Sequence, residues 1–94
     1  MQVVISRRAR TDLRDIGDFI ARDRPIRAPT FVGELLETCR GLALFPEKWP
    51  IERAFSDVAR RAVYGNYLIF YSVHPGGVRI EHIVHGSHHA RRHE

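Results

Sequence analysis

The sequence predicts an α+β fold with the element order βααβββ, in which an N-terminal strand and a helical hairpin pack on one face of a small antiparallel sheet. Three observations predict it. A short β-branched run opens the chain, apolar residues then recur at helical spacing up to residue 43, and after residue 58 the apolar period changes from about 3.6 to about 2. The 94 residues, of which 44% are hydrophobic, are enough for one globular domain over residues 1–94.

The first half of the chain contains one short strand and two amphipathic helices. Residues 3–5 form the β-branched run, and Ser6 follows as a helix N-cap. The first helix is expected over residues 7–23 and must stop near Arg24, because Pro25 disfavours the α conformation of the residue before it. The apolar stripes that define the two helices are Ala9, Leu13, Ile16 and Ile20 in the first, and Ala28, Val32, Leu35, Cys39 and Leu42 in the second.

The second half contains three expected strands joined by tight turns. The strands cover residues 59–64, 67–73 and 78–85, with Gly65-Asn66 and Pro75-Gly76-Gly77 between them. Apolar and polar residues alternate along these strands, which predicts a sheet with one face packed on a core.

Strict alternation fails in the last of these strands. It places His82 on the same face as Val78 and Ile80, and Ile83 on the opposite face. Either the strand contains a bulge that shifts its register, or both faces of the sheet are partly covered.

The net charge of +4 is concentrated in the second half of the chain. Residues 59–94 contain five basic and two acidic side chains, whereas residues 1–58 contain ten basic and nine acidic ones. Fourteen of the fifteen basic residues are arginines, whose planar fork of donors suits phosphates and carboxylates. This distribution indicates an anionic partner, either nucleic acid or an acidic protein segment.

Composition also argues against several classes of protein. The single cysteine, Cys39, excludes an internal disulfide framework and a zinc site built from several cysteines. The sequence has no N-terminal apolar segment and no apolar run of about 18 residues, which predicts a cytoplasmic protein without a membrane partner. It has no nucleophile-elbow serine and no Gly-rich phosphate loop.

Four stretches, in this order, resemble the ParE/RelE superfamily of toxins from bacterial toxin–antitoxin modules. SRRARTDLRDIGDFIARDRP is similar to the family's first helix with its Asp-Leu-x-x-Ile core, and FVGELLETCRGLALFPEKWP to the second helix ending in Leu-x-x-Phe-Pro. YGNYLIFYSV resembles the Gly-x-Tyr-x-Ile-Phe-Tyr strand, and IVHGSHH resembles the Val-x-His-Gly end of the last strand. Together the four stretches are more ParE-like than RelE-like.

The resemblance implies a growth-inhibiting toxin of a type II toxin–antitoxin system, of the kind associated with plasmid stabilization. It also implies a hetero-oligomer with a small, acidic, cognate antitoxin that wraps around the toxin. ParE-like members are associated with poisoning DNA gyrase, which is a binding mechanism that needs no catalytic residues and no cofactor. RelE-like members cleave messenger RNA in the ribosomal A site, so a ribosome-dependent endoribonuclease is the alternative.

The residues expected to bind the target lie on the strand at 59–64 and in the C-terminal tail, which we expect to lie close together across the sheet. Under the endoribonuclease alternative, His88, His89, Arg60 and Arg61 would form the catalytic set. Leu68 weakens that alternative, because the RelE-like nucleases that this chain resembles share an arginine at the corresponding position. The predicted target-binding set is Arg60, Arg61, His85, His88, His89, Arg91 and Arg92.

Two further interpretations concern metal and nucleic acid. His85, His88, His89 and His93 have spacings that could suit zinc, but no carboxylate or cysteine is aligned to complete a site, so no metal is expected. A small basic nucleic-acid-binding module is a second alternative function. Against it, both predicted helices use one face for the core and carry acids outward, which leaves no recognition helix.

Overall fold

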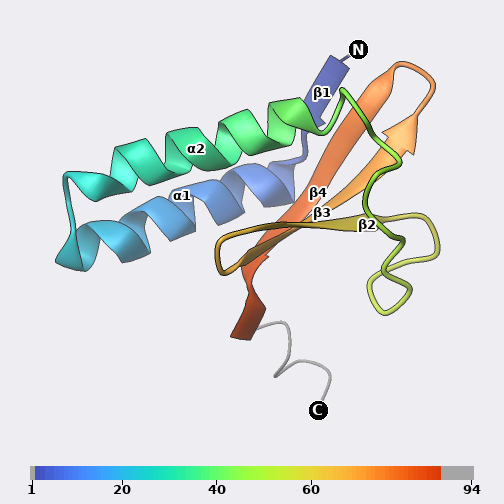
Figure 1. Cartoon of the computed structure of the whole chain (residues 1–94). Helices are drawn as coiled ribbons and strands as arrows, with labels where there is room; N and C mark the ends of the chain where they lie inside the picture. The colour runs from blue at the N-terminus through green and yellow to red at the C-terminus, as the bar shows by residue number, and fades with distance from the viewer. Residues whose placement is uncertain (1, 88–94) are drawn as a thin grey trace.

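A computed structural model describes residues 2–87 and confirms the predicted α+β fold and its element order (Figure 1). The first helix has the predicted bounds, and every strand begins and ends within one residue of its predicted bounds. The elements are β1 (Gln2–Ile5), α1 (Arg7–Asp23), α2 (Arg27–Gly41), β2 (Arg60–Tyr64), β3 (Tyr67–His74) and β4 (Gly77–His85).

Ser6 and Pro25 determine the two ends of α1. The Ser6 hydroxyl oxygen accepts a hydrogen bond from the backbone N–H of Ala9 at 3.0 Å, as an N-cap does. The same hydroxyl donates to the carbonyl oxygen of Glu81 at 3.0 Å, so the cap also ties the start of the helix to β4. At the other end, Arg24 leaves the helical conformation immediately before Pro25.

The four strands form one mixed sheet in the order β1-β4-β3-β2. β3 runs antiparallel to both β2 and β4, whereas β1 pairs with β4 in parallel, from Gln2↔Gly77 to Ile5↔Ile80. β1 is thus an edge strand of the sheet, and its parallel direction makes the sheet mixed, where an antiparallel sheet was predicted. Parallel neighbours need a long crossover, which the two helices, β2 and β3 together provide, and a four-residue strand carries no sequence signal for its direction.

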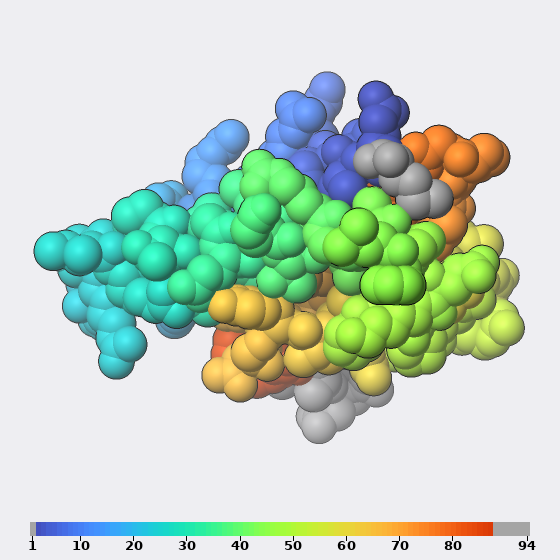
Figure 2. Space-filling model, turned by 45° about the horizontal axis from the view of Figure 1, so that its top comes forward, coloured from blue at the N-terminus to red at the C-terminus, as the bar shows by residue number. Residues whose placement is uncertain are grey.

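The two helices lie side by side in antiparallel directions on one face of the sheet (Figure 1). Figure 2 shows that α2 and the segment 42–59 after it form one continuous surface. Cys39 is fully buried in the core, and burial raises the pKa of its thiol to about 12, so the thiol stays protonated at neutral pH. The core between the helices and the sheet includes Ala9, Leu13, Ile16, Leu35, Cys39, Ile69, Tyr71, Ile80 and Ile83.

The irregular pattern in β4 has both of its expected causes. Tyr71 pairs with Ile80 and Phe70 pairs with His82, so Glu81 is an extra residue, a β-bulge that shifts the register. The bulge returns Ile83 to the core face and places His82 with Phe70 on the face that the helices do not cover. Phe55 from the segment 42–59 covers that second face, because its ring stacks on Phe70 with centroids 4.4 Å apart.

Glu34 joins α2 to the outer strand of the sheet. Its carboxylate accepts two hydrogen bonds from the Arg27 guanidinium, at 2.8 and 3.0 Å, and one from the Tyr64 hydroxyl at 2.6 Å. The hydrogen bonds from Arg27 and then Tyr64 lower the pKa of Glu34 to about 2. The bond to Glu34 in turn raises the pKa of Tyr64.

We expect Glu34 to make folding stability depend on acid pH. Because the pKa of Glu34 falls from 4.5 to about 2 on folding, the folded state binds fewer protons, and the resulting stability is present above pH 4.5 and lost as the pH falls toward 2. Glu34→Gln should therefore flatten the pH dependence of the urea midpoint in this window. Glu37→Gln, which removes an exposed carboxylate from the same helix, is the matched control. Equal flattening in both variants would contradict the role given to Glu34.

Candidate functional site

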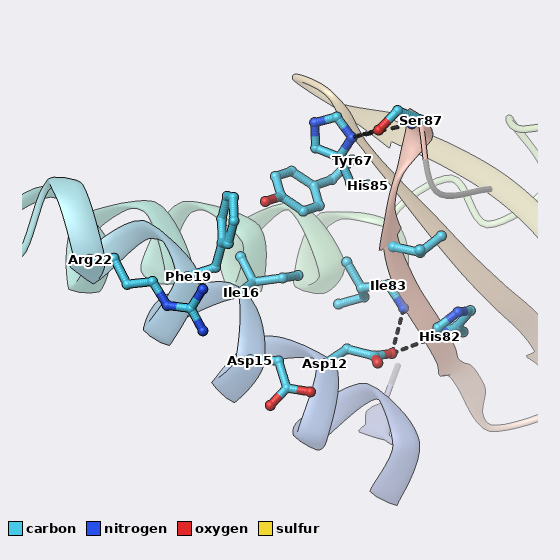
Figure 3. A pocket seen from close by; sticks show the side chains of 11 residues that line it. Asp12, Asp15, Ile16, Phe19, Arg22, Tyr67, His82, Ile83, His85 and Ser87 are labelled. Atoms are coloured by element: carbon cyan, nitrogen blue, oxygen red, sulfur yellow. Dashed lines mark hydrogen bonds and ion pairs between the residues drawn. The ribbon is translucent and has the colours of Figure 1, made fainter. Parts of the chain in front are cut away.

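An open groove of about 580 Å³ lies between α1 and the C-terminal half of β4 (Figure 3). It exists because β1 is short. β1 pairs with β4 only as far as Ile80, and the chain then turns into α1, so within residues 2–87 the rest of β4 has no strand neighbour on that side. The groove therefore has α1 as one wall and the edge of β4 beyond β1 as the other, an arrangement that can receive an additional peptide segment.

Asp12 takes the place of the missing strand neighbour at one end of the groove. Its Oδ2 atom accepts a hydrogen bond from the backbone N–H of Ile83 at 2.8 Å and another from Nδ1 of His82 at 2.6 Å. His82 is nine-tenths buried, and its Nε2 atom has no hydrogen-bond partner among the described residues. The carboxylate thus accepts hydrogen bonds from two donors of β4 that would otherwise have no acceptor. These bonds also fix α1 against the strand.

The middle of the groove is apolar and aromatic. Figure 3 shows Ile16 and Phe19 of α1 projecting toward Tyr67 of β3 and Ile83 of β4. Phe19 is 62% exposed although it belongs to the groove wall, and the guanidinium of Arg22 lies 5.9 Å from the centroid of its ring. A partner segment could pack an apolar side chain on the exposed Phe19 ring. A neighbouring acidic side chain of that segment could pair with Arg22.

His85 lies at the other end of the groove and, of the predicted target-binding residues that the structure describes, is the one that lines it. Its Nδ1 atom is 2.8 Å from the Ser87 hydroxyl oxygen and accepts the Ser87 backbone N–H at 3.2 Å. Its ring also packs edge-on against Tyr67, with centroids 5.2 Å apart. Burial raises the pKa of Tyr67, so its hydroxyl stays protonated at neutral pH.

Arg60 and Arg61 do not lie close to His85, the described member of the set with which they were expected to form a patch. β3 separates β2 from β4, and the strand register places Arg60 level with Tyr71 and Ile80, whereas Tyr64 is level with His85. We find both arginines engaged with the segment 42–59 instead. The other predicted site residues, His88, His89, Arg91 and Arg92, and with them His93, lie outside the described residues.

The segment 42–59 is fastened to the sheet by these arginines and by a tyrosine. The Arg60 guanidinium donates to the carbonyl oxygens of Trp49, at 2.6 Å, and of Glu47, at 3.3 Å. Arg61 forms an ion pair with Glu52 at 3.0 Å, and the Tyr71 hydroxyl donates to the carbonyl oxygen of Pro46 at 2.6 Å. Both arginine side chains therefore have structural partners within the chain.

Sequence reasoning did not identify the principal residues of the groove. Asp12 belongs to a helix stretch rich in charged residues, where it looks like any other solvated acid. A signal did exist for Phe19, which stands beside the apolar stripe of its helix rather than within it. Tyr67 opens an apolar strand and therefore looks like an ordinary core residue.

Residues 2–87 contain no group of three or more histidine, cysteine, aspartate or glutamate side chains that could hold a metal ion. In the same part of the chain no helix is both long and apolar enough to cross a bilayer.

The fold and the groove define a small α+β domain whose groove beside β4 is suited to a protein segment. A family model described as the ParE toxin of the type II toxin–antitoxin system parDE matches residues 3–91. The chain therefore belongs to the ParE toxin family, and the resemblance seen in the four sequence stretches is confirmed. It is a type II toxin–antitoxin toxin, and its family implies an antitoxin as partner. A search of curated proteins found no match.

Proposed function

We propose that this toxin inhibits growth by binding and poisoning DNA gyrase, and that a cognate antitoxin neutralises it. The observation that best supports a binding mechanism is the surroundings of Leu68. This residue pairs directly with Val63 on one side and with Val84 on the other, so this part of the sheet is aliphatic. RelE-like nucleases share an arginine at the position that corresponds to Leu68. An aliphatic surface there cannot balance the negative charge of a phosphorane intermediate.

The arginines that could replace this missing cation have other partners. Arg60 binds carbonyl oxygens of the segment 42–59, and Arg61 pairs with Glu52. Using either on a scissile phosphate would require that segment to be released. A toxin that acts by occupying a surface on its target needs no such rearrangement.

The groove beside β4 is our proposed seat for the antitoxin. It offers an apolar centre around Phe19 and Tyr67, a cation at Arg22 and the edge of β4 beyond its pairing with β1. An amphipathic acidic segment could satisfy all three by packing its apolar side chains along α1. Changed side-chain chemical shifts of Phe19 and Tyr67 in a complex with the product of a neighbouring reading frame would support this binding site, and unchanged shifts there would contradict it.

Two kinds of measurement test the gyrase proposal. Gyrase supercoiling is measured with the purified full chain, and the SOS response and messenger RNA integrity are measured in cells that express it. We expect inhibited gyrase supercoiling and induction of the SOS response, with messenger RNA left intact. Arg91→Ala combined with Arg92→Ala should weaken supercoiling inhibition by about tenfold, the effect of losing roughly 1.4 kcal/mol of binding energy. The same variant should keep the melting temperature of the parent.

Arg24→Ala combined with Arg53→Ala is the matched control, since it removes the same charge from exposed positions that have no ion-pair partner among the described residues. Equal inhibition by the Arg91 and Arg92 variant and the parent would remove the tail from the mechanism. Prompt translation-dependent cleavage of transcripts would favour the endoribonuclease alternative over gyrase poisoning.

A further inference from the structure

The charges of α1 are segregated along the helix. Its first two turns carry four exposed arginines, whereas its exposed aspartates come only later, at Asp15, Asp18 and Asp23. The first turn contains no acidic residue, which reverses the usual preference for acids at the positive end of the helix dipole. Both helices carry acids outward as expected, but the exposed acids of α1 come only after its first two turns. The four arginines are Arg7, Arg8, Arg10 and Arg14.

Within the described part of the chain, the side chains of these arginines form no hydrogen bond, ion pair or ring contact. Ion pairs of arginine form at Arg27, Arg40, Arg61 and Arg79, and none involves the first two turns of α1. Two possible i,i+4 partners exist on the helix, Asp12 for Arg8 and Asp18 for Arg14, but arginine precedes aspartate in both, the less favourable order. Asp12 is already engaged with β4.

Three of the four arginines form a row. Arg7, Arg10 and Arg14 are spaced by three and four residues, which places them on one side of the helix. We call these three residues the arginine stripe. A rise of about 1.5 Å per residue gives the stripe a length of roughly 10 Å. None of the three lines the groove, to which α1 contributes Asp12, Asp15, Ile16, Phe19 and Arg22.

The side chains around the stripe indicate the chemistry of its ligand. The exposed residues between positions 7 and 14 are arginines and Thr11, with no aromatic or large apolar side chain among them. Protein segments bind tightly through buried aromatic or aliphatic anchors, and single-stranded nucleic acids bind by stacking bases on aromatic rings. The stripe offers neither. It offers guanidinium forks, which match phosphate oxygens.

We propose that the arginine stripe binds the phosphate backbone of double-stranded DNA without reading its sequence. A row of cations on a straight helix can follow phosphates along one strand, and such contacts position a protein without carrying sequence information. The net charge of +4 favours the same ligand. This site lies on a different side of α1 from the antitoxin groove and requires no gyrase, so it is independent of the function proposed above.

The test measures binding of the purified full chain to a short fluorescent DNA duplex of random sequence over a series of salt concentrations. Combined Arg7→Ala, Arg10→Ala and Arg14→Ala should weaken binding at least tenfold at low salt. The slope of log K against log salt should become shallower by about 2 to 3, because each neutralised phosphate contributes about 0.9. Alanine raises helix propensity, so the variant should stay folded, which its melting curve checks.

The matched control removes three other exposed arginines, by Arg24→Ala, Arg53→Ala and Arg79→Ala, and should keep most of the affinity and slope. Equal losses in the two triple variants would reduce the effect to net charge and overturn the proposal. The proposal would also be overturned if the chain did not bind the duplex. The same holds if the arginine stripe bound polyglutamate or single-stranded RNA more tightly than the duplex. Gyrase is absent from these assays, so failure here leaves gyrase poisoning intact, and failure of gyrase poisoning leaves the stripe intact.

Discussion

Gly77→Ala should destabilise this protein by about 3 kcal/mol or more, equivalent to a fall of roughly 15 °C in melting temperature for a domain of this size. Gly77 has a φ of +151°, which side-chain-bearing residues rarely adopt. A Cβ atom at this position would overlap the carbonyl oxygen of Gln2 and lie 2.7 Å from the backbone carbon and nitrogen of Gln2. Because the clash is with backbone, it can be relieved only by displacing β1 from β4.

The neighbouring glycine provides the control. A Cβ atom on Gly76 would have no heavy atom within 4 Å, so Gly76→Ala should change the melting temperature by only a few degrees. Thermal melts of the two variants, followed by circular dichroism, make the comparison direct. Similar melting temperatures for Gly77→Ala and Gly76→Ala would show that the close approach of Gln2 is not a structural requirement.

Asp12→Ala should cost about 3 kcal/mol, because it leaves the Ile83 N–H and Nδ1 of His82 without their acceptor. Urea denaturation measures the loss as a lower midpoint. Asp12→Asn keeps one acceptor oxygen and should fall between the alanine variant and the parent. The effect reaches the groove as well, since α1 would no longer be fixed to the part of β4 beyond β1.

Asp18→Ala is the control for this substitution. Asp18 is an exposed acid on the same helix and has no hydrogen bond or ion pair among the described residues. Its replacement should change stability by no more than about 0.5 kcal/mol. If Asp12→Ala were equally mild, water would have to satisfy both donors of β4, and the carboxylate would not act as a substitute for a strand neighbour.

Local signals made most of the fold predictable from the sequence. Ser6 and Pro25 fix the ends of α1 through interactions with their immediate neighbours, and apolar periodicity separates the helices from the strands. The failure of alternation at His82 correctly indicated an irregular strand, because a bulge leaves a mark in the order of residues along one segment. Features with a local cause were therefore visible in the sequence.

Features that depend on distant partners were not predictable. The parallel direction of β1 follows from where the whole chain returns, and the pairing of Asp12 with His82 joins residues 70 positions apart. Arg60 was expected to face a target because it is cationic, yet carbonyl oxygens of the segment 42–59 surround it. One sequence contains no information on which of its arginines find partners inside the fold.

The pairing of β1 with β4 also determines when this toxin can finish folding during its synthesis. The first strand finds its neighbour only after Gly77–Ile80 has been made, and Asp12 finds its donors only after Ile83. The helical hairpin can form early because its contacts are local, but closing so long a loop is slow and comes last. At roughly 5–20 residues per second, translation therefore keeps the nascent chain incomplete for several seconds. The groove beside β4 is built at the end of that interval, so a partner that recognises it meets a newly finished chain.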